Sequence, residues 1–118
     1  MSIIRHADQT DIRGYRQIVT SAVGATTCTL WDQTIPPGGA ITPHYHESEE
    51  TLTFLIGTVE VTLGDQTMLV DADTTVFIPA GALHGVRNHG SEPARLIAFF
   101  PTVEPKVIYP DGSSVSVG

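Results

Sequence analysis

Basic residues and long apolar runs are scarce in this sequence. Lysine and arginine together number 6, against 13 aspartate and glutamate residues, which gives a net charge of −7. We therefore expect neither nucleic acid nor an anionic membrane as a partner, because both are bound through basic surfaces. No apolar run approaches the roughly 20 residues that cross a bilayer.

Cysteine is nearly absent as well, since Cys28 is the only one in 118 residues. A lone cysteine forms no internal disulfide, which suits a reducing compartment, and we interpret Cys28 as a small buried apolar residue. The opening "MSIIRHADQT" lacks the basic stretch and long apolar run of a signal peptide. These features predict a cytoplasmic protein.

The apolar residues that are present lie in short segments. They make up 41% of the chain, and the length predicts a single domain over residues 1–118. In residues 58–65, Val59, Val61 and Leu63 alternate with polar residues, which is the period of a half-buried strand. Comparable segments, separated by glycine, proline and other turn residues, are 26–35, 51–57, 66–71, 74–80, 84–90 and 94–101.

Short strands, frequent turns and little helix together predict an all-β sandwich or barrel. The dipeptide at Gly64 and Asp65 predicts a turn between two of the strands. Helix is limited to one turn at most between Asp8 and Arg16. The outlying segments are an N-terminal arm at residues 1–20 and a polar C-terminal tail at residues 104–118, which we expect to fray or to form an edge strand.

Two histidines lie one residue apart in the stretch "GGAITPHYHESEETLTFLIG". Side chains at positions i and i+2 of a strand point the same way, so His44 and His46 share a face and Tyr45 points to the other. The acidic run that follows holds Glu50, which a turn would bring back toward the histidines, and Glu49 is the alternative carboxylate. The spacing predicts that both imidazoles reach one cation.

A third histidine, His84, follows a turn signal at Pro79 and Gly81. That turn would start a strand pointing back into the same cavity. Three neutral imidazoles and one carboxylate suit one divalent transition metal per chain, namely Fe, Mn, Ni, Cu, Co or Zn, rather than Ca or Mg. Four protein ligands would leave two open positions on an octahedral ion for water, dioxygen or a bidentate substrate.

These residues carry a resemblance to the cupin superfamily. The first cupin motif, at residues 38–57, is matched by Gly38, His44, His46, Glu50 and Gly57. The second, at residues 73–88, is matched by Pro79, Gly81, His84 and Asn88, with Asp73 where that motif opens on glycine. Aspartate tolerates turn conformations better than most residues.

The resemblance implies an antiparallel jelly-roll β-barrel (double-stranded β-helix) with the metal ligands inside it. It also implies a homodimer, because such barrels commonly pair through exposed strands. The candidate metal ligands are His44, His46, Glu50 and His84, and a cupin that has lost its metal is the alternative. Asn88 is expected to be structural. His6 and His89 lie outside the motifs, and we interpret His6 as a solvated N-terminal residue and His89 as a loop residue.

The pocket wall should come from inward alternate positions near the ligands. Arg87 is expected to point outward, and the direction of Arg95 is left open. With few basic residues available, a substrate with several negative charges, such as a sugar nucleotide, is not favoured. Leu52 and Phe54 share the parity of Glu50, and Val86 shares that of His84. Together with Trp31, Phe99 and Phe100 they are the candidate wall residues, and each is interpreted first as a core residue.

The resemblance predicts a metal-dependent oxidoreductase, similar to cupin dioxygenases, that acts on a small organic molecule. Two alternatives stay open. One is a cupin that binds or senses a small ligand without turnover. The other is a Lewis-acid isomerase or decarboxylase, for which the sequence shows no separate acid–base pair.

Overall fold

The computed structural model describes residues 1–116, and within them it contains strands and two single-turn 3-10 helices but no α-helix. No helix in this described part is long and apolar enough to span a membrane. The elements are η1 (His6–Asp8), β1 (Tyr15–Val19), η2 (Ser21–Val23), β2 (Thr29–Ile35), β3 (Ala40–His44), β4 (Glu50–Ile56), β5 (Thr58–Leu63), β6 (Gln66–Asp71), β7 (Thr74–Ile78), β8 (His84–Arg87), β9 (Ala94–Phe100), β10 (Lys106–Ile108) and β11 (Ser114–Ser116).

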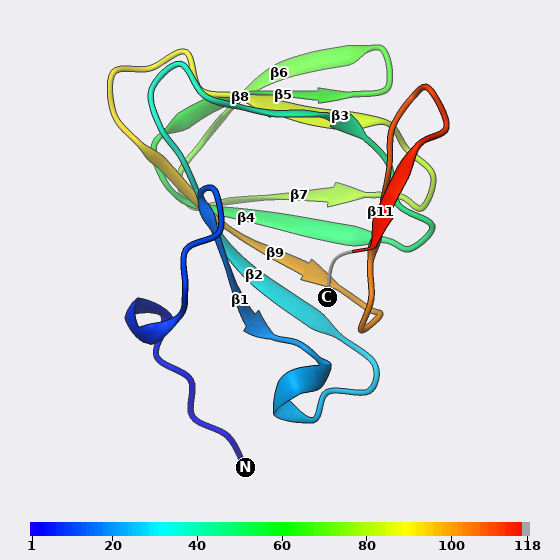
Figure 1. The fold of residues 1–118 in the computed structure, drawn as a ribbon. Coiled ribbons are helices and arrows are strands. Elements are labelled where there is room, and N and C mark those ends of the chain that lie inside the picture. Colours follow the sequence, from blue (N-terminus) through cyan, green and yellow to red (C-terminus); the bar gives the residue numbers. More distant parts are fainter. Residues whose placement is uncertain (117–118) are drawn as a thin grey trace.

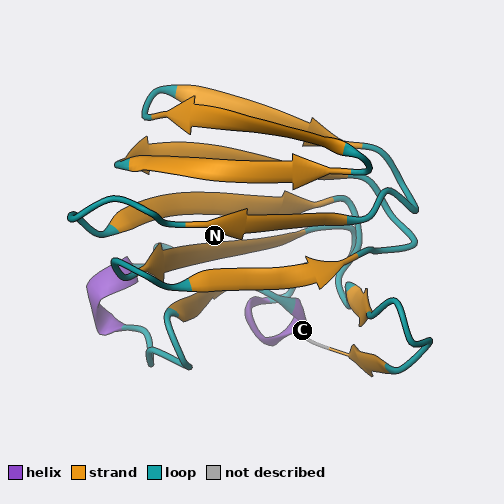
Figure 2. Cartoon of the chain, turned by 90° about the horizontal axis from the view of Figure 1, so that it is seen from above, coloured by secondary structure: helices purple, strands orange, loops and turns teal. Residues whose placement is uncertain are grey.

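Two sheets face each other and enclose the core (Figure 1). One has five strands in the order β1-β2-β9-β4-β7, and the other has four in the order β3-β8-β5-β6. Neighbouring strands run antiparallel, as the view from above in Figure 2 also shows. A separate hairpin of β10 and β11 stands at one open end. The expected all-β, antiparallel jelly-roll fold is confirmed.

Every segment predicted as a strand holds one, and the turn at Gly64 and Asp65 joins β5 to β6. The N-terminal region differs from expectation. Its helical turn lies earlier, at His6–Asp8, whereas Ile12 and Tyr15 exchange backbone hydrogen bonds across a tight reversal that leads into β1. The interpretation of Cys28 as a buried residue was also wrong, because its side chain is partly exposed just before β2.

The C-terminal tail is a hairpin for as far as it is described. Strands β10 and β11 pair from Lys106 opposite Ser116 to Ile108 opposite Ser114. Val117 and Gly118, which belong to the expected tail, lie outside the described residues. The edge-strand alternative therefore describes the tail better than fraying does.

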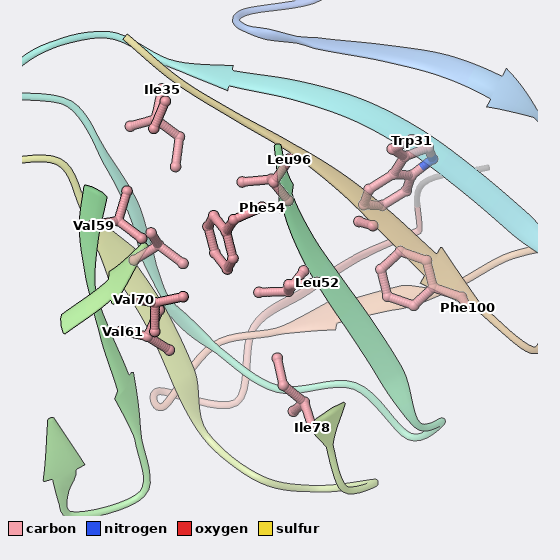
Figure 3. Packing of buried hydrophobic residues seen from close by; sticks show 13 residues of the cluster. Trp31, Ile35, Leu52, Phe54, Val59, Val61, Val70, Ile78, Leu96 and Phe100 are labelled. Atoms are coloured by element: carbon pink, nitrogen blue, oxygen red, sulfur yellow. The ribbon is translucent and has the colours of Figure 1, made fainter. Parts of the chain in front are cut away.

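Alternating side chains of the two sheets form the core between them (Figure 3). Along β9, Ala94, Leu96, Ala98 and Phe100 point inward and are fully buried. Phe54 of β4 is 1% exposed and lies in the same cluster. Burying each such large apolar side chain contributes roughly 1.5–3 kcal/mol to the free energy of unfolding.

Two turn positions show why the motif residues are what they are. At Gly57, an added Cβ atom would lie 2.9 Å from the Cα atom of Ala94, so only glycine lets β4 and β9 approach this closely. Asp73 adopts the left-handed conformation, with φ of 64°, and its backbone N–H donates to the carbonyl of Phe54 at 2.8 Å. Aspartate tolerates this conformation, so it can replace the glycine of the second motif.

Asn88 ties three chain segments together beneath the surface. Its side chain is 1% exposed and donates to the carbonyls of Ile35 at 2.9 Å and Glu92 at 2.8 Å. Its Oδ1 accepts the backbone N–H of Gly90 at 3.0 Å. The structural role expected for Asn88 is confirmed, and it anchors the end of β8, the strand that begins with His84.

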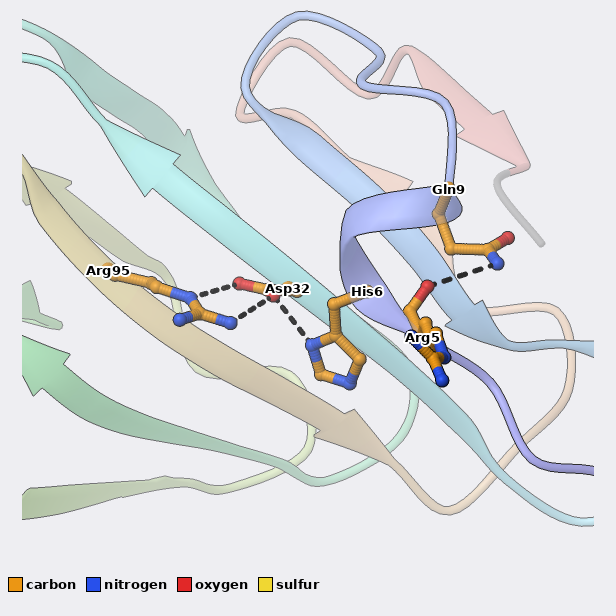
Figure 4. Close-up of polar contacts among 5 residues, drawn as sticks. All are labelled: Arg5, His6, Gln9, Asp32 and Arg95. Atoms are coloured by element: carbon orange, nitrogen blue, oxygen red, sulfur yellow. Dashed lines mark hydrogen bonds and ion pairs between the residues drawn. The ribbon is translucent and has the colours of Figure 1, made fainter.

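A buried carboxylate on the outer face of β2 holds the N-terminal arm (Figure 4). Arg95 donates to both oxygens of Asp32, from Nε at 2.9 Å and from Nη2 at 2.6 Å. His6 Nδ1 lies 2.7 Å from Asp32 Oδ2 on the other side. The expectation that His6 is simply solvated was wrong, because its ring contacts a buried carboxylate. The contact joins residues 26 positions apart in the sequence.

The hydrogen bond from Arg95 lowers the pKa of Asp32, with a further contribution from His6, and together they outweigh burial, which raises it. A carboxyl with a lowered pKa stabilises the fold above its unfolded pKa, and that stabilisation is lost as the pH falls through the folded value. We expect Asp32→Asn to lower the free energy of unfolding by about 1–3 kcal/mol at pH 7. The difference from wild type should shrink in acid, below about pH 4.

Urea denaturation at several pH values measures this difference. Asp71→Asn is the matched control, because Asp71 is exposed and its nearest partner is the Thr58 hydroxyl. It should change stability by no more than about 0.5 kcal/mol. If the loss of unfolding free energy in Asp32→Asn stayed constant down to pH 2, the charge of Asp32 would not contribute to stability.

Candidate metal centre

The four sequence-predicted ligands meet where the two sheets join. His44 ends β3 and lies directly opposite His84, which begins β8 in the same sheet. Glu50 begins β4 of the facing sheet, and His46 lies in the short connection between β3 and β4. The turn expected after His46 therefore brings the carboxylate back toward the histidines.

Short distances join these four side chains, and all four are buried. The Nε2 atoms of His44 and His46 are 3.1 Å apart. Glu50 Oε1 lies 2.9 Å from His84 Nε2 and 3.3 Å from His46 Nε2. One ligating nitrogen from each histidine lies within 4.8 Å of the others, so the three histidines could hold a metal ion.

The other ring nitrogen of each histidine is oriented by the backbone. A carbonyl oxygen only accepts, so each Nδ1 carries the hydrogen and each Nε2 presents a lone pair when the ring is neutral. Such outer contacts fix the tautomer and direction of a metal-ligating histidine. The accepting carbonyls are those of Thr42 for His44 at 2.7 Å, Lys106 for His46 at 2.8 Å and Ala82 for His84 at 3.0 Å.

The protonation states agree with a ligand role. Burial lowers the pKa of His44 to about 4, so this imidazole is neutral near pH 7. Burial raises the pKa of Glu50, and hydrogen bonds from protonated His46 and His84 rings would lower it by more. With neutral rings, the charge of a bound cation would stabilise the carboxylate instead. A neutral imidazole and an ionised carboxylate are the forms that bind a metal.

A divalent transition metal fits this donor set. Glu50 Oε1 is buried and has no hydrogen-bond donor, given the tautomers that the carbonyls select. Three nitrogen lone pairs and one carboxylate thus converge with no hydrogen between them. A cation satisfies all four, and imidazole with carboxylate suits the first-row transition metals.

An apolar cavity of about 220 Å³ opens beside His44. A smaller space of about 20 Å³ lies deeper, against His44, Glu50 and His84. Of the residues that the structure describes, those that line the cavity include no arginine, lysine, aspartate or glutamate. It is lined by Tyr15, Trp31, Gln33, Ile41, Thr42, His44, Val107, Tyr109 and Val115.

The candidate wall residues fall into three groups. Trp31 lines both spaces, and Leu52 and Val86 line the deeper one. Phe54 lies in the core, while the ring of Phe100 packs 4.8 Å from those of both Trp31 and His46. The placement of Phe99 in the wall was wrong. It has the opposite parity to Phe100 on β9, is 39% exposed, and lies on the outer face beside Phe77.

His89, Arg87 and Arg95 lie away from the ligands. His89 is exposed, 3.6 Å from Glu60, and Arg87 is exposed as its parity predicted. Arg95, whose direction was left open, pairs with Asp32 on the outer face. None of them reaches the cavity wall.

Sequence reasoning missed the part of the wall that comes from the two ends of the chain. Tyr15 comes from the segment expected to be an N-terminal arm, residues 1–20. Val107, Tyr109 and Val115 come from the segment expected to be a C-terminal tail, residues 104–118. A signal for the latter was present. Asp111 and Gly112 form a hairpin signal between a segment that holds Val107 and Ile108 and a segment that holds Val115.

Replacing both His44 and His46 with alanine should abolish stoichiometric metal binding, because two of the four ligands are lost. The barrel should stay folded, because both residues lie at one end of the core. Metal content by mass spectrometry and thermal unfolding measure the two effects. His89→Ala is the control, since this histidine is exposed and outside the cluster. A double variant that kept one full equivalent of metal would disprove the ligand assignment.

Glu50 and its neighbour Glu49 make a matched pair for the carboxylate ligand. Glu50 is buried beside the histidines, whereas Glu49 is exposed. Glu50→Gln keeps the shape but removes the charge, so we expect metal affinity to fall by about tenfold or more. Glu49→Gln should bind as wild type does in the same metal titration, and the reverse result would move the ligand to Glu49.

Comparison with known proteins finds related sequences. Tetracenomycin polyketide synthase protein TcmJ of Streptomyces glaucescens is 29% identical over 90 residues, which cover 75% of this chain and 60% of that protein. Polyketide synthase CurC of Streptomyces cyaneus is 34% identical over 85 residues, which cover 71% of this chain and 55% of that protein. The chain thus spans little more than half the length of these curated relatives.

The solved structure of polyketide cyclase RemF from Streptomyces resistomycificus has the same fold. Its TM-score is 0.80 at 24% sequence identity, and the match covers 100% of this chain and 86% of that one. Residues 31–100, more than half of the 118 residues here, match the cupin domain family. The chain is therefore a member of the cupin family.

Proposed function

We propose that this cupin is a metal-dependent enzyme that closes a ring in, or isomerises, a small uncharged molecule with neighbouring carbonyl groups, of the kind found in polyketides. One observation carries the proposal. Three imidazole lone pairs and a buried carboxylate converge at the inner end of an apolar cavity. This arrangement places a cation where a bound substrate's oxygens would meet it.

The cavity wall supports a neutral, flat ligand. Tyr15, Trp31 and Tyr109 supply aromatic surface, and the wall has no charged side chain that would hold an anion. Gln33 and Thr42 supply the few polar groups, which is the usual composition of a small-molecule site. A volume of about 220 Å³ suits a compact molecule of one or two rings.

A divalent ion held by His44, His46, Glu50 and His84 would act as a Lewis acid toward carbonyl oxygens. The carbon between two carbonyls loses a proton, for which Glu50, lining the deeper space, is the nearest carboxylate acceptor. That carbon then attacks the carbon of a third carbonyl of the same molecule, and the oxygen of this carbonyl takes up the proton held by Glu50. Loss of the resulting hydroxyl, together with a second proton from the attacking carbon, releases water. This sequence needs no oxidant, and the apolar wall keeps bulk water from the reacting carbons.

A cupin dioxygenase is the second candidate, because the same nitrogen and oxygen donors bind redox-active Fe, Mn, Ni and Cu. The likeness to proteins named for polyketide synthesis supports the first candidate. A binding protein without turnover would use the same cavity. The three functions differ in what happens to a 1,3-diketone.

Benzoylacetone, a neutral aromatic 1,3-diketone, is the probe that separates them. With metal-loaded protein in D₂O near pH 7, we expect the absorption band of its enolate to appear without oxygen consumption at an electrode, together with faster exchange of its C2 hydrogen for deuterium over many turnovers. A binding protein would give the band without the faster exchange. The His44→Ala and His46→Ala double variant should give no band. Oxygen uptake with loss of the diketone would establish the dioxygenase instead, and absence of both signals would contradict catalysis on this substrate class.

A further inference from the structure

The three histidines of the metal centre are not oriented in the same way. His44 and His84 each donate to the carbonyl two residues earlier in the chain, at Thr42 and Ala82. His46 instead donates to the carbonyl of Lys106, which is 60 residues away. The direction and tautomer of one ligand therefore depend on the C-terminal hairpin, residues 106–116.

Backbone pairing docks this hairpin beside His46. The N–H of Tyr45 donates to the carbonyl of Ile108 at 2.8 Å, and the N–H of Ile108 donates back to the carbonyl of Tyr45 at 2.9 Å. This single bridge sets the register that places the Lys106 carbonyl at His46 Nδ1. The ion pair of Lys106 with Glu47, at 3.5 Å, is exposed and adds little.

The same hairpin forms one side of the cavity. Val107 and Tyr109 of its first half and Val115 of its second half line the space beside His44. The ring of Tyr109 lies 6.4 Å from that of His44. Figure 1 shows β11 standing across the end of the barrel, outside both sheets.

We propose that hairpin 106–116 is a positioning element for His46, which couples closure of the cavity to the affinity for metal. When the hairpin is docked, the Lys106 carbonyl keeps the hydrogen on Nδ1 and the lone pair on Nε2 toward the other ligands. When it is undocked, the ring is free to rotate and to carry its hydrogen on Nε2, which removes one ligand. This inference rests on the metal centre of the proposed function.

The coupling must work in both directions, because linkage between two binding events is reciprocal. A docked hairpin raises metal affinity, so bound metal must also favour the docked hairpin. A molecule that touches Val107, Tyr109 and Val115 from inside the cavity would likewise favour docking. The hairpin belongs to neither of the two main sheets, so it can separate without unfolding them.

Ile108→Pro is the variant that tests the coupling. Proline removes the N–H that donates to Tyr45 and so weakens docking, while none of the ligand residues is itself replaced. Ile108→Val is the matched control, because it keeps the N–H and the β-branched shape. We expect Co²⁺, followed by its visible absorption, to bind the proline variant about 10–100-fold more weakly than wild type, with the valine variant unchanged.

Hydrogen exchange supplies a readout that needs neither catalysis nor the variant. Amides of residues 106–116 in wild-type protein should exchange more slowly when Co²⁺ is present, and this protection should be lost in Ile108→Pro. Circular dichroism and thermal unfolding without metal show whether the barrel of the proline variant is intact. Equal Co²⁺ affinity of wild type and Ile108→Pro, or exchange that metal does not change, would overturn the coupling.

Failure of the coupling is distinguishable from failure of the proposed function. If wild type and the proline variant both bind Co²⁺ tightly, the metal centre is supported, and the hairpin lines the cavity without affecting metal affinity. If wild type binds no Co²⁺, both proposals fall. If coupling is found but benzoylacetone gives no enolate band, the hairpin's role stands and the proposed reaction does not.

Discussion

The structure is organised around a cluster of hydrogen-bond acceptors that has no donor of its own. Backbone carbonyls take the Nδ1 hydrogens of His44, His46 and His84, so their Nε2 lone pairs converge on one another and on the Glu50 carboxylate. A buried carboxylate without a partner costs several kcal/mol. A cation at this point would satisfy all four groups at once, which would explain why so polar a cluster lies inside an apolar barrel.

Each ligand comes from a different part of the fold, and the fold's connections make the meeting possible. His44 and His84 are cross-strand partners in one sheet, Glu50 begins a strand of the other, and His46 lies in the link between the sheets. The C-terminal hairpin completes the arrangement from outside both sheets through the Lys106 carbonyl. We propose that metal binding, cavity shape and the docking of hairpin 106–116 depend on one another through this one contact with a ligand.

Local rules predicted much of this from the sequence. Alternation along residues 58–65 marked a strand, His-x-His spacing placed two imidazoles on one face, and Asp73 occupies the turn conformation that its motif position requires. Predictions failed where the outcome depends on contacts distant in sequence. His6 contacts Asp32, which is 26 residues away. Phe99 lies on the outer face because Phe100, its neighbour on β9, is the one that points into the core. Sequence spacing carries no information on which strand a chain end will meet, so the wall supplied by Tyr15 and Tyr109 was not foreseen.

The central claim is that these four side chains hold a transition metal, and the most direct test is the metal content of the protein itself. Untagged protein, purified without a chelating column, would be measured by mass spectrometry as isolated and after soaking with Fe²⁺, Mn²⁺, Ni²⁺, Cu²⁺, Co²⁺ and Zn²⁺ in turn. We predict close to one equivalent of one transition metal per chain, lost in the His44→Ala and His46→Ala double variant. Protein that contains no metal and takes none up from any of these ions would contradict the account.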